Sequence, residues 1–529
     1  MKNEQEKKTM KGALILSIAS LIAKILSAVY RIPFENIVGN TGFYVYQQVY
    51  PIYGICMTFA LTGFPVYISK LIAEQHDEAA KIKLSQQIFV ILCVFSLGSF
   101  FGLRLFAPLL ARAMGDMALI SLIRSVSWML LFMPFLAVGR GYYQGTFNMV
   151  PTAISQVTEQ FMRVFVIIVA AVMFAHFNWD YYKMGSLAMF ASSAGAIVAC
   201  FSFVRFFSRD FRVKTTVPRF SYLQLTEKIF TEGVIICLFA STMVLLQLID
   251  SFTVVRGLLH NGYLPEAAKN LKGIYDRGQP LLQLGMVLAV GFSSTLLPTL
   301  SHALKNKKMA EFRRISKVML RISITISVAA AFGMIVLMPQ INTLLFGDAL
   351  LSRELSMYIF SVVFITLIGT YNSILQSLNQ FLITVVGLLA AIVVKFVLNV
   401  WLIGRLDLMG ASVATVLSLL VALGFILVFS PELIRGLFSE GHFWLKLGAT
   451  TVNMLIVVKA FVLVYSHLIG NTRMDTLFIS LGGASLGAIV FVVSALAFKL
   501  FSVREWLMLP GGKKILKVWQ KLTRKGEQI

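Results

Sequence analysis

Charged residues are scarce in this chain of 529 residues, where Asp, Glu, Lys and Arg together make up only 13%. Soluble globular proteins carry about 25%, so the composition argues against a soluble domain. Signatures of common enzymes are also missing. The sequence has no P-loop and no HExxH motif, which excludes an encoded ATP motor and the HExxH class of zinc hydrolases. We therefore expect no catalytic residue and predict that the protein is not an enzyme.

Cysteine and histidine are few and isolated. The four cysteines lie singly in apolar stretches without a CxxC pair, and the six histidines are also single. Zinc sites and disulfide frameworks need clustered or regularly spaced ligands. We therefore predict no metal site, no disulfide framework and no cofactor.

Apolar sequence is what the chain has in abundance. Hydrophobic residues make up 58%, and the mean hydropathy is +0.81. A stretch of about 18 apolar residues is long enough to cross a bilayer as a helix, and such stretches recur along the chain. We predict an all-α polytopic membrane protein with about fourteen transmembrane helices. The expected spans are 12–34, 44–73, 84–112, 119–146, 150–176, 183–207, 224–257, 278–304, 316–346, 354–379, 382–404, 408–430, 444–467 and 475–500.

The net charge of +23 is distributed unevenly. Basic clusters precede the first predicted span and follow the sixth, the eighth and the last, whereas the connections after odd-numbered spans carry few cations. By the positive-inside rule both termini are expected in the cytoplasm. No small-residue cleavage site follows the first apolar stretch, so we expect a retained helix rather than a signal peptide. The charge thus reflects topology and attraction to anionic lipids, and no nucleic-acid partner is expected.

An offset of 232 residues relates polar features of two halves of the chain. The matched residues are Gly115 and Gly347, Asp116 and Asp348, Gln144 and Gln376, and Arg163 and Lys395. Because each half holds six predicted spans, the offset predicts two six-helix lobes related by a parallel repeat. The expected parts are an N-terminal lobe (1–207), a cytoplasmic linker (208–223), a second lobe (224–430), two additional helices (431–500) and a basic cytoplasmic tail (501–529).

Several cations lie inside the predicted spans, where a charge is costly and usually serves a function. Lys24 lies near the middle of the first span, and we expect it to face a cavity. Arg31 lies near the outer end of that span, where it could instead reach the interface by snorkelling. In the fifth span, Glu159 and Arg163 are four residues apart and share a helical face. They can neutralise each other, or Arg163 can contact a substrate.

Asp250 lies deep in the seventh predicted span. An isolated carboxylate at that depth must pair with a cation or take up a proton. Lys395, in the eleventh predicted span, is a candidate partner.

The start of the eighth predicted span carries a family resemblance. Tyr275-Asp276-Arg277, followed by the segment 295–301, resembles the lipid II flippase family of the MOP exporter superfamily. Gly278-Gln279-Pro280-Leu281 and Gly42-Phe43-Tyr44 with Gln47 and Tyr50-Pro51 are similar to the Gram-positive branch, which includes stage V sporulation protein B and YtgP-like flippases. The resemblance covers essentially the whole chain and implies a multi-pass protein of the bacterial cytoplasmic membrane.

The resemblance implies transport of undecaprenyl-diphosphate-linked sugars from the inner to the outer leaflet by alternating access, driven by the membrane potential or an ion gradient. By motif, the functional cations of the family fall on Lys24, Arg31, Lys70 and Arg277. Some relatives bind sodium through acids in the seventh and eleventh spans, whereas here Lys395 and Asn399 occupy the eleventh.

Taken together, these observations predict the following site. The expected substrate-binding residues are Lys24, Arg31, Lys70, Arg163 and Arg277, and those expected to support charge or gating are Glu159, Asp250, Asp276 and Lys395. The expected partners are a polyprenyl-diphosphate-linked sugar and membrane lipids, with the protein itself a monomer.

Three alternatives stay open. A drug or cation antiporter of the same superfamily needs a mainly acidic cavity, whereas the charges within these spans are mostly basic. A polytopic enzyme acting on lipid-linked sugars needs catalytic carboxylates on sizeable exterior loops, and these loops are short. A non-transporting scaffold would leave the repeated charges at membrane depth without a purpose.

Overall fold

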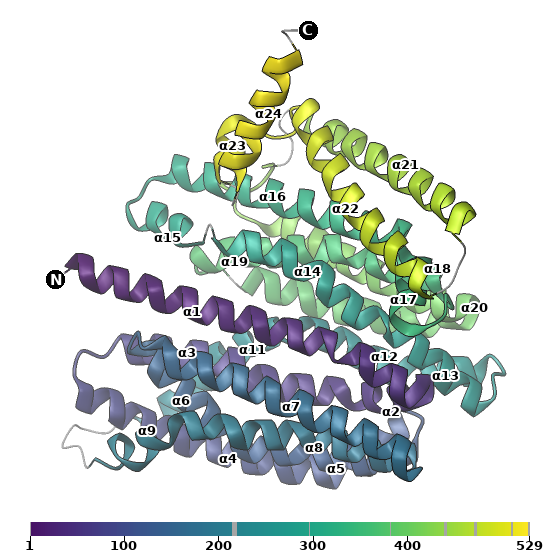
Figure 1. Cartoon of the computed structure of the whole chain (residues 1–529). Helices are drawn as coiled ribbons and strands as arrows, with labels where there is room; N and C mark the ends of the chain where they lie inside the picture. The colour runs from purple at the N-terminus through teal and green to yellow at the C-terminus, as the bar shows by residue number, and fades with distance from the viewer. Residues whose placement is uncertain are drawn as a thin grey trace. The chain divides into compact units, whose positions relative to one another are not determined.

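The computed structural model describes residues 2–213, 220–295, 297–380, 382–437, 442–469, 473–508 and 511–526. The middle of the predicted linker (214–219), Leu296 in the family motif and residues 509–510 and 527–529 of the predicted tail lie outside this range. Every regular element within it is a helix, and eleven helices are long and apolar enough to cross a membrane (Figure 1). Two of the eleven, Ile15–Ala73 and Leu382–Phe429, each cover two predicted spans. The prediction of an all-α polytopic membrane protein is confirmed.

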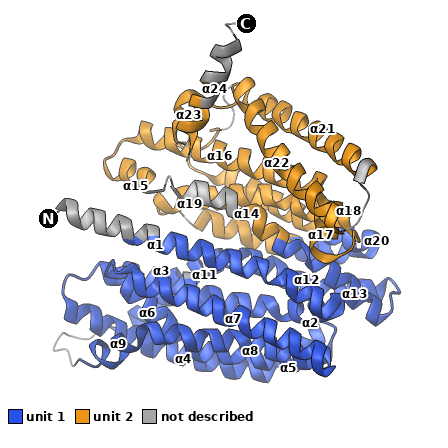
Figure 2. Ribbon diagram, viewed as in Figure 1, with its two compact units in different colours: residues 1–280, 395–411 blue, residues 281–394, 412–529 orange. Residues whose placement is uncertain are grey.

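The chain divides into two compact units, drawn in blue and orange in Figure 2. Unit 1 comprises residues 1–280 and 395–411. Its helices are α1 (Lys2–Val29), α2 (Arg31–Thr58), α3 (Phe64–Ala73), α4 (Glu78–Ala113), α5 (Ile120–Ser127), α6 (Met133–Gly145), α7 (Met149–Phe177), α8 (Tyr181–Cys200), α9 (Val204–Ser208), α10 (Tyr222–Lys228), α11 (Val234–Ala240), α12 (Thr242–His260) and α13 (Pro265–Asp276).

Unit 2 comprises residues 281–394 and 412–529. Its helices are most of α14 (Gly278–Thr295), α15 (Leu297–Lys305), α16 (Met309–Val336), α17 (Met338–Phe346), α18 (Ser352–Ile359), α19 (Ser361–Ser377), both ends of α20 (Leu382–Phe429), α21 (Phe443–Ile469), α22 (Arg473–Ala497), α23 (Val503–Met508) and α24 (Gly512–Gly526). The units thus divide after residue 280, and the central segment of α20 belongs to unit 1. Compactness and internal repetition are different criteria, so the lobes and their boundary at 208–223 stay a prediction.

The 232-residue offset reappears in the local backbone. Gly115 and Gly347 both end a helix in the left-handed region, with φ of +82° and +91°. Each is followed by an aspartate whose side chain accepts a backbone N–H two residues further on, at 3.1 and 2.9 Å. Phe147 and Asn379 also share a left-handed conformation, with φ of +59° and +58°. Equivalent helix ends in the two halves of the chain therefore have the same backbone structure.

Two helices contain a sharp bend that divides predicted spans. α2 is interrupted at Gly39, whose φ of +71° is accessible to glycine at little cost, and α20 is interrupted at Asp407 with φ of +49°. The first predicted span extended to residue 34, but α1 ends at Val29. Tyr30 nevertheless has helical backbone angles and accepts the N–H of Phe34, so helical backbone continues past Val29 to the bend at Gly39. Arg31, in the first turn of α2, therefore lies on the same side of that bend as the first predicted span.

Candidate functional site

A cluster of arginine and tyrosine side chains lies at the junction of α1 and α2. Tyr30 joins the two helices, and α2 carries Tyr46, Tyr50 and Tyr53. Spacings of four and three residues place these three rings on one face of the helix. Arg31 is contributed by the first turn of α2 and Arg163 by α7. These six residues are called the arginine–tyrosine cluster below.

Both guanidinium groups of the cluster lie against aromatic rings. The Cζ atom of Arg31 is 4.3 Å from the ring centroid of Tyr50 and 6.0 Å from that of Tyr30. The Cζ atom of Arg163 is 4.7 Å from the centroid of Tyr53 and 5.4 Å from that of Tyr30. Such contacts stabilise a cation through the ring quadrupole, by about 0.5–2 kcal/mol each. Tyr30 is thus shared by the two guanidinium groups.

Neither guanidinium group of the cluster has a carboxylate partner in the part of the chain that the structure describes. The side chains of Arg31 and Arg163 are buried, with exposed fractions of 0% and 2%. None of the three guanidinium nitrogens of Arg31 has a hydrogen-bond partner there. Nη2 of Arg163 donates to Oγ of Ser27 at 3.1 Å, whereas its Nε has no partner among the described residues. A buried charge without a counter-ion costs several kcal/mol. The cluster is therefore suited to receive an anion.

The other buried cations of unit 1 are each neutralised by a carboxylate. The pairs are Arg140 with Glu159 (2.5 Å), Arg277 with Glu35 (2.5 Å), Lys395 with Asp250 (2.7 Å) and Lys272 with Asp276. The remaining buried carboxylate of unit 1, Asp116, pairs with Lys269 at 3.3 Å. Across the described residues of unit 1, Arg31 and Arg163 thus contribute two buried positive charges that no carboxylate balances.

Of the two interpretations of Arg163, the structure does not show the pair with Glu159. Although the two residues are four positions apart on α7, the Glu159 carboxylate accepts a hydrogen bond from Arg140 on α6. The sequence prediction missed Arg140. The sequence feature that marks Arg140 is its position between two glycines, Gly139 and Gly141. In the structure, a Cβ at either glycine would lie within 2.6 Å of a side chain on a neighbouring helix. The two glycines let helices pack closely around the arginine, which encloses it with its partner.

Arg277, predicted to bind substrate, lies buried in an ion pair. Its Nε donates to Oε1 of Glu35 at 2.5 Å and its Nη2 to Oδ1 of Asn40 at 2.8 Å. Both partners are on α2, on either side of the bend at Gly39. In this state Arg277 holds α2 beside the end of α13 rather than standing open to an anion.

Close packing of α13 on α2 depends on Gly273. A Cβ at this position would lie 2.0 Å from the backbone oxygen of Asn40. We expect Gly273→Ala to push the helices apart and to cost about 1–3 kcal/mol, in line with other overpacked cores. Thermal unfolding of the purified protein measures the loss. Gly333→Ala is the matched control, because a Cβ there would meet nothing within 4 Å.

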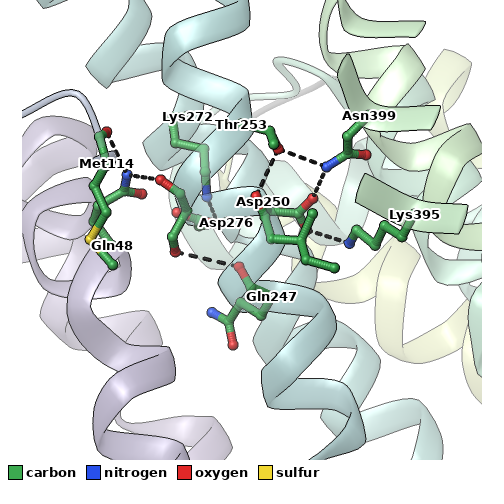
Figure 3. Close-up of polar contacts among 11 residues, drawn as sticks. Gln48, Met114, Gln247, Asp250, Thr253, Lys272, Asp276, Lys395 and Asn399 are labelled. Carbon is green, nitrogen blue, oxygen red and sulfur yellow. Dashed lines mark hydrogen bonds and ion pairs between the residues drawn. The ribbon is translucent and has the colours of Figure 1, made fainter. Parts of the chain in front are cut away.

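The predicted partnership of Asp250 and Lys395 is confirmed (Figure 3). Nζ of Lys395 donates to Oδ2 of Asp250 at 2.7 Å, and Nδ2 of Asn399 donates to Oδ1 of Asp250 at 2.8 Å. The same amide lies 2.9 Å from Oγ1 of Thr253. The lysine ammonium thus supplies the positive charge that the buried Asp250 carboxylate requires.

This arrangement gives an expectation for sodium. Because Lys395 already balances the charge of Asp250, a sodium ion at this carboxylate would gain little binding free energy. We expect replacement of sodium by potassium to leave the melting temperature of the purified protein unchanged. A sodium-specific rise in melting temperature that Asp250→Asn abolishes would show that the carboxylate binds the metal instead.

Asp276 and Lys272 form a second buried pair in the same region (Figure 3). Both lie on α13, which is not one of the helices long enough to cross a membrane. Burial raises the pKa of the Asp276 carboxyl above its ordinary value, and the Lys272 ammonium opposes that rise. The structure identifies Lys272 as the partner of Asp276. It does not test the predicted role of Asp276 in supporting charge or gating.

The structure places Lys24 and Lys70 outside the arginine–tyrosine cluster. Lys24 is exposed on α1. Lys70, on α3, is also exposed and lies 3.5 Å from Glu232. Exposed ion pairs of this kind contribute about 0–1 kcal/mol. Of the five predicted substrate-binding residues, the structure therefore brings together Arg31 and Arg163.

Comparison with known proteins finds a matching family model and similar proteins. A family model described as polysaccharide biosynthesis protein matches residues 9–304. An uncharacterized membrane protein of Bacillus subtilis (strain 168), YabM, is 33% identical over 522 residues, which cover 97% of both chains. Lipid II flippase MurJ of the same organism is 28% identical over 450 residues, or 80% of this chain and 82% of the relative.

A solved structure shares the fold. The structure of a lipid II flippase MurJ in an inward closed conformation superposes with a TM-score of 0.68 at 15% identity. The superposition covers 92% of this chain and 98% of that chain.

Proposed function

Because the chain belongs to the polysaccharide biosynthesis protein family of MOP exporters, we propose that it flips undecaprenyl-diphosphate-linked sugars across the cytoplasmic membrane. It falls in the branch that contains lipid II flippases and stage V sporulation protein B. It is accordingly a membrane transporter rather than an enzyme. The identity of the cargo is inferred from the charges of the arginine–tyrosine cluster.

The observation that carries the proposal is the unbalanced charge of Arg31 and Arg163. A lipid-linked diphosphate diester brings two negative charges, which matches the two guanidinium groups that lack a carboxylate. Guanidinium groups suit phosphate because their planar donors can bind two oxygens at once. The tyrosines stabilise the cations while the site is empty, through contacts that yield when a stronger anionic partner arrives.

The buried position of both arginines requires the protein to open before cargo binds. Lys24 is exposed on α1. In the proposed mechanism it attracts the diphosphate as the cargo approaches the arginine–tyrosine cluster. Rocking of the two lobes then exposes the loaded site to the other side. A membrane potential that is positive outside favours outward movement of the anion by about 2.3 kcal/mol per charge per 100 mV.

The same charges disfavour the antiporter alternative. A cationic drug bound beside Arg31 and Arg163 would be repelled by their two unbalanced positive charges. A cation exporter needs the opposite sign of excess charge at its central site.

Depletion of the protein tests the proposed function. In cells without a compensating homologue, we expect a lipid-linked sugar to accumulate in the inner leaflet. Chemical identification of that lipid shows which cargo the protein transports. The measurement is leaflet-resolved extraction and mass spectrometry of lipid-linked intermediates. An unchanged distribution of every such intermediate between the leaflets would contradict the proposal.

A further inference from the structure

The C-terminal end of α4 is a junction of several helices in unit 1. α4 ends at Ala113, Gly115 has the left-handed backbone described above, and Asp116 caps the short turn that follows. By the positive-inside rule, this end of α4 and helix α13 are expected on the exterior side of the membrane. Carbonyl groups in the last turn of a helix are only partly used within that helix, so they can accept hydrogen bonds from other elements.

Two carbonyl groups near the C-terminal end of α4 accept hydrogen bonds from other helices. Nη2 of Arg256 on α12 donates to the backbone oxygen of Arg112 at 2.5 Å. Nε2 of Gln48 on α2 donates to the backbone oxygen of Met114 at 3.4 Å (Figure 3). The same amide donates to the backbone oxygen of Ser251 on α12 at 2.6 Å. Hydrogen bonds to backbone groups therefore join the end of α4 to α2 and α12.

The Asp116 side chain adds a charged contact to this junction. Its Oδ2 accepts hydrogen bonds from the hydroxyl groups of Tyr182 on α8, at 2.6 Å, and Tyr44 on α2, at 3.3 Å. Nζ of Lys269 on α13 is 3.3 Å from the same oxygen and 2.9 Å from the Tyr182 hydroxyl. Asp116 is only 7% exposed, so loss of the lysine would leave its carboxylate poorly solvated and without a cation.

These contacts join the two predicted lobes. Arg112 and Asp116 belong to the predicted N-terminal lobe (1–207), whereas Arg256 and Lys269 belong to the predicted second lobe (224–430). Both sides of every contact lie in unit 1, so the structure places them together in this state. Rocking of the lobes, as in the transport cycle proposed above, would have to break these contacts before the exterior side could open.

Lys269 is suited to a contact that breaks and forms again. Its side chain is 16% exposed, whereas that of Arg277, directly after α13, is 1% exposed. Water can therefore solvate the Lys269 ammonium as soon as it leaves Asp116, whereas Arg277 would lose its partner inside the protein. The side chain of Arg256 is likewise exposed.

We propose that Lys269 and Arg256 form an exterior latch. They hold the second predicted lobe to the end of α4, keep the outer side closed, and release it once in each transport cycle. The latch rests on the alternating access of the proposed function, but not on the identity of the cargo. The alternative is a purely structural role, in which the same contacts hold α13 in place in every state.

The latch is tested in intact cells with a cysteine reporter in the full-length protein. Ser251 is 1% exposed and lies on α12 beside Gln48 of α2, so Ser251→Cys should react with a membrane-impermeant maleimide only when the exterior side opens. We expect Lys269→Gln to raise the labelling rate about tenfold, because loss of a charge-assisted hydrogen bond shifts the opening equilibrium by about that factor. Lys269→Arg keeps the charge and should label at the rate of the unmodified latch. The protein without the reporter corrects for labelling of the native cysteines.

Two controls separate opening of the exterior side from general loosening. Glu266→Gln removes an exposed carboxylate 3.8 Å from Lys269 and should change the labelling rate by less than about twofold. Ser192→Cys is a second reporter, buried within α8, and should stay unlabelled in Lys269→Gln. The latch is wrong if Lys269→Gln leaves the labelling of Ser251→Cys unchanged, raises it equally at both reporters, or labels no faster than Lys269→Arg. Labelling requires no cargo, so this result is independent of the depletion experiment that tests the proposed function.

Discussion

Arg163→Gln should lower the flux of a lipid-linked diphosphate about 10–100-fold while the protein stays as stable as the wild type. A hydrogen bond to a charged partner contributes about 1.5–3 kcal/mol, which corresponds to that range. Stability is spared because Arg163 has no carboxylate partner among the described residues, so its removal strands no buried charge. Flux in proteoliposomes and thermal unfolding in detergent give the two readouts.

Arg140→Gln is the matched control, since Arg140 is an arginine at similar burial on the neighbouring helix. It leaves the Glu159 carboxylate buried without a partner and should cost about 3–5 kcal/mol of stability. Arg163→Lys keeps the charge but loses the planar fork, so an intermediate flux is expected. If Arg163→Gln unfolds like Arg140→Gln, or keeps full flux, Arg163 does not bind the cargo.

Arg277→Ala should destabilise the protein by about 3–5 kcal/mol, the usual cost of breaking a buried ion pair from one side. Glu35 would lose its ion pair with Arg277, and Asn40 would lose the hydrogen bond that it accepts. Loss of transport in this variant would therefore follow from loss of folded protein. The melting temperature and the yield of monodisperse protein measure the effect.

The double variant Arg277→Gln with Glu35→Gln should recover part of this stability, because it removes both charges together. Lys70→Ala is the control at an exposed pair, where the loss of the contact with Glu232 should cost no more than about 1 kcal/mol. If Arg277→Ala folds normally and yet abolishes flux, Arg277 acts on the cargo directly, as its family motif implies.

The membrane fold could be predicted from the sequence because long apolar stretches leave few alternatives to helices. Helix ends were less certain, and the bend at Gly39 shows why. The first predicted span ends at residue 34, whereas the residue whose positive φ breaks the helical backbone is Gly39, and Arg31 lies before it. The repeat was visible because Gly115 and Gly347 carry a backbone requirement that constrains residue type.

The partners of the buried charges were harder to predict because they come from distant parts of the chain. Arg277 and Glu35 are 242 residues apart, so no local pattern joins them. The local rule failed for Glu159, since its carboxylate lies 2.5 Å from Nη2 of Arg140 on the neighbouring helix. Lys395 was identified because few carboxylates lie within the predicted spans, and Asp250 was deep enough to need a cation.

The most direct test of the arginine–tyrosine cluster compares the binding of undecaprenyl diphosphate with that of undecaprenyl phosphate. Native mass spectrometry of the wild type and of the double variant Arg31→Gln with Arg163→Gln measures both affinities. We expect the wild type to prefer the diphosphate and the double variant to lose that preference while it still binds the monophosphate carrier. A double variant that folds and keeps the wild-type preference would contradict the assignment of the diphosphate to these two guanidinium groups.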